Sequence, residues 1–441
     1  MHQLAIALLR QGHQITGSDD HITDPAYTQL QLAGILPEAE GWFPERITEK
    51  TDAVVLGMHA REDNPELVRA QALHIPIYSF PEYIYEVSKN KKRVVVAGSH
   101  GKTTITSMIM HMLRVREFQF DYLVGARVAG FPQSVQITEA PLIVLEGDEY
   151  PASVIEKKPK IFFYHPQISV LSGIAWDHIN VYPSYDIYFN QFVTWLQMLE
   201  PGSILIYNTR DPEVVRLVTQ YGSHVQCIPY GMPEYEYRDG KAVILTSTGK
   251  FTTSVLGKHN LLNMQAAIAV GQQLGIHADE AYASLTDFTG AARRLEKIHE
   301  TPHLVAFRDF AHAPSKLKAT IEAVREAYPF HQLIACFELH TYSSLSDIFL
   351  KQYHASMDMA DKAIVYFSPE ALALKKLPAL DPEIVKKQFG SDNLEVIHNK
   401  EILQTKVYTL LSEREKPVCL LLMSSGTFDG IDWNALCSQN N

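Results

Sequence analysis

The chain has 441 residues, of which 46% are hydrophobic and 20% charged, and its formal net charge is −11. Taking ~150 residues per domain, this length predicts about three domains, with enough apolar sequence to form cores without disulfides or structural metals. The acidic balance argues against nucleic acid or an anionic membrane as a main partner. The four cysteines are widely spaced, with no C-x-x-C pair, which indicates buried thiols in a reducing compartment.

The N-terminal stretch MHQLAIALLRQGHQ is not typical of a signal peptide. It lacks a basic first region and a cleavage site, and Met1, Leu4, Ala5 and Leu8 mark one face of a helix. No apolar run elsewhere approaches the ~18 residues that can span a bilayer. We therefore expect a cytoplasmic protein with no membrane partner.

The first predicted block begins with a helix over about 1–11, followed by strands at 13–20, 52–58 and 75–79. Strands that alternate with helices predict a parallel sheet. The chain opens inside a helix, whereas a parallel nucleotide-binding sheet begins with a strand and a Gly-rich turn. We therefore expect either a truncated first domain or a start placed too late.

Two further α/β blocks follow the polar linker SKNKKR at 88–93. The second block is expected to contain strands at 93–98, 141–148, 168–177, 202–208 and 224–231, and the third at 304–312, 331–339, 362–367 and 418–426. The fold class predicted from these alternating patterns is α/β.

A short glycine loop joins the first strand of the second block to a helix; it reads Gly98-Ser99-His100-Gly101-Lys102-Thr103-Thr104. It is shorter than the G-x-x-x-x-G-K-[ST] pattern. Its chemistry is still that of a phosphate site, because the glycines expose backbone N–H groups, the helix N-terminus attracts anions and Lys102 adds a charge. An ordinary turn with an exposed lysine is the alternative. The strand–loop–helix context favours nucleotide phosphates, with the Thr103 hydroxyl placed to ligate Mg²⁺.

Three carboxylates, Glu146, Asp148 and Glu149, follow the next apolar strand. Mg²⁺ prefers oxygen ligands, usually one or two carboxylates together with substrate phosphates. A solvated acidic turn is the alternative. Asp177 and His178 end a further strand, where His178 is a candidate second metal ligand, although a lone histidine is more often structural.

Polar residues in the last third of the chain have two possible roles. Asn260 and Asn263 open an Ala-rich helix, either as N-cap residues or as partners of an adenine edge. Arg294, next to Arg293, is either part of a solvated basic pair or a phosphate ligand. Asp309 and His312 follow a strand, a typical place for site residues in an open α/β sheet.

In this order, the motifs GSHGKTT, DEY, WDHIN, KHNLLN, GAARRLE and DFAHAPSK resemble the muramyl (Mur) ligase family. The resemblance implies a three-domain Mur ligase architecture. Its parts would be a truncated Rossmann-like UDP-binding domain at 1–90, a central P-loop ATPase domain at 91–294 and a C-terminal Rossmann-like domain at 295–441 that presents the amine.

The resemblance also implies an ATP-dependent amide ligase of peptidoglycan metabolism. ATP would phosphorylate the lactyl carboxylate of UDP-N-acetylmuramate, and an amine would attack the acyl phosphate. Mg²⁺ and Lys102 would offset the negative charge that these groups bring together.

The roles implied by the resemblance extend to all three blocks. Lys102 and Thr103 would hold the phosphates and the first Mg²⁺, Glu149 (or Glu146) would be a metal ligand and His178 would bind the second metal. Asn260 and Asn263 would lie beside the adenine, Arg294 and Asp309 would contact ATP, and His312 would lie near the acyl phosphate. The UDP-sugar or the amine substrate would be bound by Ser18, Asp19, Asn64 and His340.

The amine donor is not decided by these motifs. Family branches that add later residues have a modified lysine, but no lysine stands between Lys160 and Lys241. This favours the branch that contains the L-alanine ligase and the recycling ligase for the tripeptide L-Ala-γ-D-Glu-meso-diaminopimelate. The segment from Glu146 to Pro166 resembles the recycling ligase, whereas FELHTYSSLSD, with His340 and Tyr342, resembles the alanine ligase.

We expect the tripeptide as donor and keep L-alanine as the alternative. A nucleotide-binding homologue that has lost ligase activity is a third possibility. A folate or amino-acid polyglutamylating ligase shares the ATPase core but does not need the α/β block at 1–90.

Overall fold

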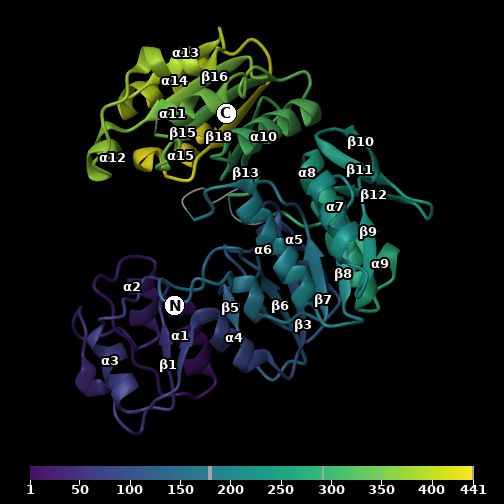
Figure 1. Cartoon of the computed structure of the whole chain (residues 1–441). Helices are drawn as coiled ribbons and strands as arrows, with labels where there is room; N and C mark the ends of the chain where they lie inside the picture. The colour runs from purple at the N-terminus through teal and green to yellow at the C-terminus, as the bar shows by residue number, and fades with distance from the viewer. Residues whose placement is uncertain (177–180, 291–292, 346, 440–441) are drawn as a thin grey trace. The chain divides into compact units, whose positions relative to one another are not determined.

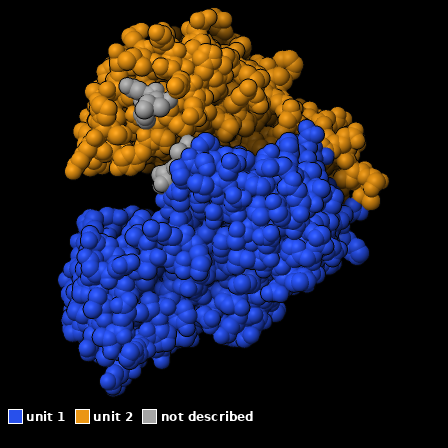
Figure 2. All heavy atoms as spheres, in the orientation of Figure 1, with its two compact units in different colours: residues 1–232, 263–285 blue, residues 233–262, 286–441 orange. Residues whose placement is uncertain are grey.

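The computed structural model describes residues 1–176, 181–290, 293–345 and 347–439. Its contacts divide the chain into two compact units (Figure 2). Unit 1 comprises Met1–Met232 and Asn263–Leu285, and unit 2 comprises Pro233–Leu262 and Thr286–Asn441. Among the described residues, no helix is both long and apolar enough to cross a membrane.

The N-terminal part of unit 1 is built around two short strands that pair in parallel, Val54 with Ile77 and Leu56 with Ser79. Its elements are α1 (His2–Arg10), α2 (Ala26–Leu32), η1 (Pro44–Arg46), β1 (Val54–Leu56), α3 (Pro65–Ala72), β2 (Ile77–Ser79) and α4 (Phe80–Ser88). The strand expected at 13–20 was wrong. Apart from a single bridge between Asp19 and Gly41, this polar segment has no strand partner in the described structure, and a strand needs a neighbour for its hydrogen bonds.

The rest of unit 1 is dominated by a seven-stranded sheet in the order β5-β4-β6-β3-β7-β8-β9, parallel except for the β4–β5 pair (Figure 1). The strands are β3 (Lys92–Ala97), β4 (Asp121–Leu123), β5 (Val135–Gln136), β6 (Leu142–Glu146), β7 (Ile168–Leu171), β8 (Ile204–Asn208) and β9 (Gln226–Tyr230). The central strands β3 and β7 are largely apolar and buried on both faces, as parallel strands covered by helices usually are.

The helices that accompany this sheet are α5 (Lys102–Val115), η2 (Lys160–Phe163), α6 (Tyr185–Met198), α7 (Pro212–Tyr221), α8 (Lys258–Gln273) and α9 (Ala278–Ser284). Helices α5, η2, α6 and α7 lie between strands of this sheet in the chain, whereas α8 and α9 follow its last strand, and α9 packs against α5. The division between the two units falls inside α8, after Leu262.

Unit 2 contains a six-stranded sheet in the order β13-β14-β18-β15-β16-β17, parallel except for β13. Its strands are β13 (Glu296–Glu300), β14 (Leu304–Asp309), β15 (Gln332–Leu339), β16 (Lys362–Phe367), β17 (Leu394–Ile397) and β18 (Val418–Met423). Buried apolar clusters lie on both faces. The accompanying helices are α10 (Pro314–Ala327), α11 (Asp347–Leu350), η3 (Lys351–Tyr353), α12 (Pro369–Leu374), α13 (Pro382–Phe389), α14 (Lys400–Ser412), η4 (Phe428–Gly430) and α15 (Trp433–Ser438).

A smaller antiparallel sheet also belongs to unit 2. It consists of β10 (Glu234–Arg238), β11 (Lys241–Leu245) and β12 (Lys250–Thr253). These strands were not predicted from the sequence, because β10 and β12 are rich in charged and polar residues. The mixed α/β class and the parallel sheets predicted from the sequence are confirmed.

Candidate active site

The predicted phosphate loop lies at the centre of the seven-stranded sheet. β3 has β6 on one side and β7 on the other, and all three are parallel. The carboxyl ends of adjacent parallel strands meet at one edge of a sheet, which is where open α/β sheets bind their ligands. The loop after β3, the acidic segment after β6 and residues 172–175 after β7 are therefore brought together.

Two glycines give the loop its shape. Gly98 has a φ of 122° and Gly101, the N-cap of α5, has a φ of 80°, a region that residues with a Cβ atom rarely adopt. A Cβ atom on Gly98 would collide with Ser172 Oγ, and one on Gly101 would collide with Asn263 Oδ1. Both positions therefore require glycine for reasons of backbone conformation and of space.

Ser99 is held by the segment that follows β7. The backbone N–H of Ser99 donates to Gly173 O (2.9 Å), and Ser99 Oγ accepts from the N–H of Ala175 (2.8 Å). His100 Nδ1 lies 2.9 Å from Ser99 Oγ, and Thr104 is buried in the first turn of α5. The loop is thus a fixed backbone cradle at a helix N-terminus, the geometry that binds phosphate oxygens.

Lys102 lies inside this cradle. Its Nζ donates to Gly98 O (2.8 Å) and to Glu149 Oε2 (2.6 Å), and it lies 3.9 Å from Asp148 Oδ1. Burial favours a lower pKa for Lys102, but the negative charges of Glu149 and Asp148 outweigh it, and the pKa is raised. Lys102 therefore stays protonated at neutral pH.

The two candidate metal carboxylates have different surroundings. Glu149 is fully buried and also accepts from the Tyr188 hydroxyl (3.1 Å). Glu146 accepts from Thr103 Oγ1 (2.8 Å) and from the backbone N–H of Gly125 (2.7 Å). The structure thus brings the Thr103 hydroxyl to Glu146 and the Lys102 ammonium to Glu149.

These oxygen donors fit Mg²⁺ chemically. No group of three or more His, Cys, Asp or Glu side chains is arranged as a ready metal site in the part of the chain that the structure describes. Mg²⁺ does not need one, because it commonly takes one or two carboxylates and completes its shell with phosphate oxygens and water. His178, the predicted second metal ligand, lies outside the described residues.

Lys160 also lies at this cluster of charged groups, although its position was not predicted from the sequence. Its Nζ lies 2.9 Å from Asp148 Oδ2, so Asp148 has a lysine beside each of its oxygens. The run EKKPK, a few residues after the acidic motif, could have drawn attention to it.

The two asparagines of α8 lie in different surroundings. Asn263 is buried beside Gly101, so it contributes directly to the loop's environment in unit 1. Asn260 is buried in unit 2, and its Nδ2 donates to Leu256 O (3.0 Å) in the preceding turn. Asn260 is the third residue of α8 and donates to a carbonyl, whereas an N-cap side chain accepts from backbone N–H groups, so this contact does not fit the capping alternative.

In unit 2, the predicted residues Arg294, Asp309 and His312 gather around Phe310. The Arg294 guanidinium lies 5.2 Å from the centre of the Phe310 ring, and the His312 ring packs edge-on against it at 5.3 Å. Asp309 Oδ2 accepts from the N–H of Leu295 (2.6 Å) and Oδ1 from that of Ala311 (2.7 Å). Asp309 therefore fastens the turn that carries Arg294 to the end of β14.

His340 follows β15 at the same edge of the unit 2 sheet. Its Nδ1 is 3.6 Å from Oε1 of the buried Glu338 and has no hydrogen-bond partner among the described residues. Glu338 Oε2 accepts from the Ser424 hydroxyl and from the N–H of Phe428 (2.8 Å). His340 is thus a half-buried imidazole with an unused inner nitrogen.

The predicted UDP-site residues are largely occupied with structural contacts. The Asn64 side chain caps α3 by accepting from the N–H groups of Glu66 and Leu67. The Ser18 hydroxyl donates to Glu66 Oε1 (2.6 Å), and Asp19 Oδ1 accepts from the N–H of Asp20 (2.9 Å). Ser18 and Asn64 are brought close through Glu66, and the Asn-Pro-Glu sequence could have been recognised as a helix start.

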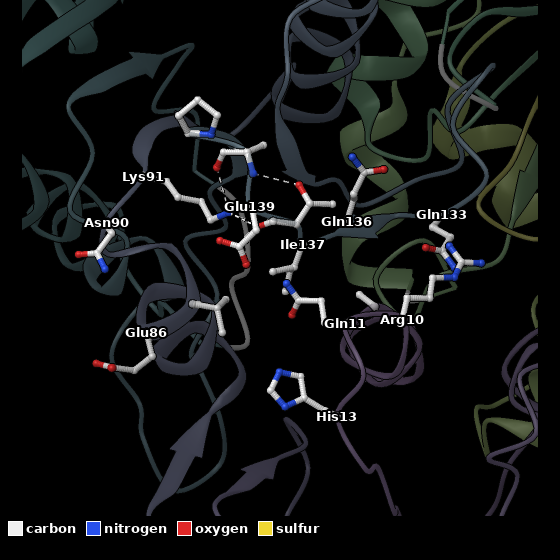
Figure 3. A pocket seen from close by; sticks show the side chains of 15 residues that line it. Arg10, Gln11, His13, Glu86, Asn90, Lys91, Gln133, Gln136, Ile137 and Glu139 are labelled. Atoms are coloured by element: carbon white, nitrogen blue, oxygen red, sulfur yellow. Dashed lines mark hydrogen bonds between the residues drawn. The ribbon is translucent and has the colours of Figure 1, made fainter.

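A cavity of about 920 Å³ lies elsewhere in unit 1, and Figure 3 shows its lining, which includes Arg10, His13, Lys91 and Glu139. Lys91 and Pro141 directly precede β3 and β6, so the cavity is at the amino ends of these strands. It is separate from the phosphate loop at their carboxyl ends.

A glycine loop, a lysine and carboxylates at the carboxyl edge of a parallel sheet are the arrangement typical of nucleotide-phosphate-binding α/β proteins. Residues 1–92 match the family model "Mur ligase family, catalytic domain", and residues 96–271 match "Mur ligase middle domain". A UDP-N-acetylmuramate–L-alanine ligase from Lactiplantibacillus plantarum is 31% identical over 387 residues, which cover 82% of this chain and 80% of that protein. The chain belongs to the Mur ligase family, whose members are ATP-dependent ligases that form carbon–nitrogen bonds.

Two solved structures extend this comparison. A UDP-N-acetylmuramate–alanine ligase from Thermotoga maritima has a TM-score of 0.70 at 19% identity, covering 97% of this chain and 94% of that chain. A UDP-N-acetylmuramate:L-alanyl-γ-D-glutamyl-meso-diaminopimelate ligase from Neisseria meningitides has a TM-score of 0.59 at 25% identity, covering 65% of this chain and 94% of that one. The first similarity supports the fold alone.

Proposed function

We propose that this protein joins the lactyl carboxylate of UDP-N-acetylmuramate to the tripeptide L-Ala-γ-D-Glu-meso-diaminopimelate, at the expense of ATP, in peptidoglycan recycling. The observation that carries the proposal is the position of Lys102, 2.8 Å from Gly98 O and 2.6 Å from Glu149. It places a permanent positive charge inside a glycine cradle, beside carboxylates suited to a metal–nucleotide complex.

The chemistry follows from the weakness of a carboxylate as an acyl donor. Transfer of the γ-phosphoryl group from ATP converts one carboxylate oxygen into part of a good leaving group, and the amine then displaces phosphate. The loop N–H groups and Lys102 stabilise the negative charge during transfer, because preorganised donors act most strongly in such a site. Bound Mg²⁺, held by Thr103 and by Glu149 or Glu146, would supply further charge neutralisation.

The other roles follow the family resemblance. Asn260 and Asn263 are proposed to lie beside the adenine. Arg294 and Asp309 are proposed to contact ATP, and His312 the acyl phosphate. His178 is proposed to bind a second Mg²⁺, and His340 the amine substrate. The UDP-sugar is proposed to contact Ser18, Asp19 and Asn64. The domains proposed for these functions are residues 1–90, 91–294 and 295–441.

Different observations favour the tripeptide and L-alanine as the amine donor. The tripeptide is favoured by the segment from Glu146 to Pro166 and by the similarity to the Neisseria ligase at 25% identity. L-Alanine is the second candidate, because curated relatives at 28% to 31% identity are UDP-N-acetylmuramate–L-alanine ligases.

The test is phosphate release from ATP with Mg²⁺ and UDP-N-acetylmuramate, with either the tripeptide or L-alanine as donor. Phosphate release that depends on the tripeptide supports the proposal. Phosphate release that depends on L-alanine would instead identify a ligase of primary peptidoglycan synthesis. Protection of the chain from unfolding by ATP, without phosphate release with either donor, identifies a nucleotide-binding homologue that has lost ligase activity.

A further inference from the structure

After β6 the chain makes an excursion that returns to its starting point. The N–H of Lys160 donates to Tyr150 O (3.0 Å), that of Ala152 to Lys158 O (2.9 Å) and that of Ile161 to Asp148 O (3.1 Å). These hydrogen bonds pair the outgoing and returning segments. As a result, Lys160 lies beside the acidic motif although it is 12 residues from Asp148.

The charge of Lys160 is directed at the phosphate site. Its Nζ contacts Asp148 Oδ2 at 2.9 Å, while Asp148 Oδ1 lies 3.9 Å from Lys102 Nζ. The side chain of Lys160 is 21% exposed, so a ligand can reach it. Two ammonium groups thus lie on either side of one carboxylate, and only Lys102 belongs to the glycine loop.

The same excursion contacts the N-terminal part of unit 1. The N–H of Val154, near its tip, donates to Met58 O (3.0 Å), and Met58 lies just after β1. Lys160 is therefore carried by a segment that joins the phosphate loop to the part of the chain proposed to bind the UDP-sugar. The backbone hydrogen bonds already hold this segment closed, so the pairing of Lys160 with Asp148 is not needed for its shape.

We propose that Lys160 binds the substrate carboxylate that is phosphorylated, while Lys102 holds the γ-phosphate of ATP. In this step a carboxylate oxygen forms a bond to the γ-phosphorus. The bond from the γ-phosphorus to the β–γ bridging oxygen breaks, and its electron pair leaves with ADP. Lys160 keeps its protons throughout and lowers the repulsion between two anions that must come into contact. This inference rests on the acyl-phosphate chemistry of the proposed function, but not on the identity of the amine.

The experiment is isotope exchange between labelled ADP and ATP, with UDP-N-acetylmuramate and Mg²⁺ and with no amine, because it reports acyl-phosphate formation alone. Lys160→Met is expected to reduce exchange by about 100-fold, in the range found when one charge-stabilising donor is removed, and to raise the KM for UDP-N-acetylmuramate. ATP affinity, measured by calorimetry, should change by less than about twofold, because Lys102 and the loop are intact. Lys160→Arg should recover part of the loss.

Lys158→Met is the matched control, because Lys158 belongs to the same excursion but is 65% exposed and pairs with Glu156 at 3.5 Å. It should exchange like the unaltered protein. Normal exchange and normal UDP-N-acetylmuramate affinity in Lys160→Met would overturn the inference, as would a loss explained entirely by a lower unfolding temperature. Absence of exchange in the unaltered protein would instead overturn the acyl-phosphate chemistry, and the inference with it.

Discussion

The phosphate loop in unit 1 and the sheet edge around Phe310 in unit 2 hold their functional side chains in different ways. In unit 1 the charged groups neutralise one another, Lys102 with Glu149 and Lys160 with Asp148. In unit 2 the carboxylate of Asp309 is satisfied by backbone N–H groups, and Arg294 lies over an aromatic ring.

The difference has a physical consequence for ligand binding. Glu149 is fully buried, and a buried ion pair that loses one partner leaves an uncompensated charge. Lys102 can therefore leave Glu149 only when another anion pairs with the lysine and a cation pairs with the carboxylate. Phosphate groups with Mg²⁺ satisfy both conditions. The groups of unit 2 need no exchange of partners, because backbone contacts already orient them.

The largest expected effect is that of Lys102→Met. Removing this ammonium should lower the rate of phosphate release by at least about 100-fold and weaken ATP binding measured by calorimetry. It also leaves the buried Glu149 without its cation, and the uncompensated charge should lower the unfolding temperature. Lys158→Met is the control, and unchanged ATP affinity in Lys102→Met would contradict the role of the loop.

Gly101→Ala should have the next largest effect. The left-handed backbone costs an alanine about 1–2 kcal/mol, and the new Cβ atom would also collide with Asn263 Oδ1. Gly275→Ala is a matched control, because Gly275 has a φ of 89° but, among the described residues, open space where its Cβ atom would stand. We expect thermal unfolding to shift in both variants and ATP affinity to fall only in Gly101→Ala. An equal loss of ATP affinity in the two variants would contradict a specific role of Gly101 in the loop.

Asp309→Asn tests how unit 2 positions its groups. An amide can accept one backbone hydrogen bond, but its NH₂ group then faces a second N–H, so one buried donor loses its partner at a cost of about 1–3 kcal/mol. The control is Asp381→Asn, at the exposed N-cap of α13, where asparagine caps as well as aspartate. Chemical denaturation should show a loss in Asp309→Asn alone, and equal stability of the two variants would refute the clamp on Leu295.

Local sequence was sufficient to predict the strand–loop–helix geometry around Lys102, because that geometry is local. Two glycines, a lysine and a helix start are contiguous, and the apolar run of β3 identifies the strand before them. The carboxylates of Glu146 and Glu149 were predictable for the same reason, since they stand at and just after the end of β6. Which carboxylate contacts Thr103 and which contacts Lys102 depends on how β3 and β6 pair, and a sequence pattern does not reveal this pairing.

Non-local pairing explains what the sequence did not reveal. Lys160 reaches Asp148 only because backbone hydrogen bonds close the segment between them, and Asp309 contacts Leu295 because β13 folds back on β14. The strand predicted at 13–20 was wrong because strand formation also depends on a partner. In the described structure this segment has no strand partner beyond one bridge at Asp19.

The smallest expected effect concerns the cysteines, and it compares the units as wholes. Cys336, Cys419 and Cys437 are buried in unit 2, whereas Cys227 in unit 1 is half-buried. Burial raises the pKa of Cys336 to about 12 and that of Cys437 to about 11.

The measurement is alkylation at about pH 8, near the ordinary thiol pKa, followed by mass spectrometry. Cys227 should be modified first, because thiolates are the reactive form. Labelling of the other three should begin only at denaturant concentrations that unfold unit 2. Early labelling of Cys336 without denaturant would show that unit 2 opens under native conditions, which would contradict a rigid, preoriented set of groups around Phe310.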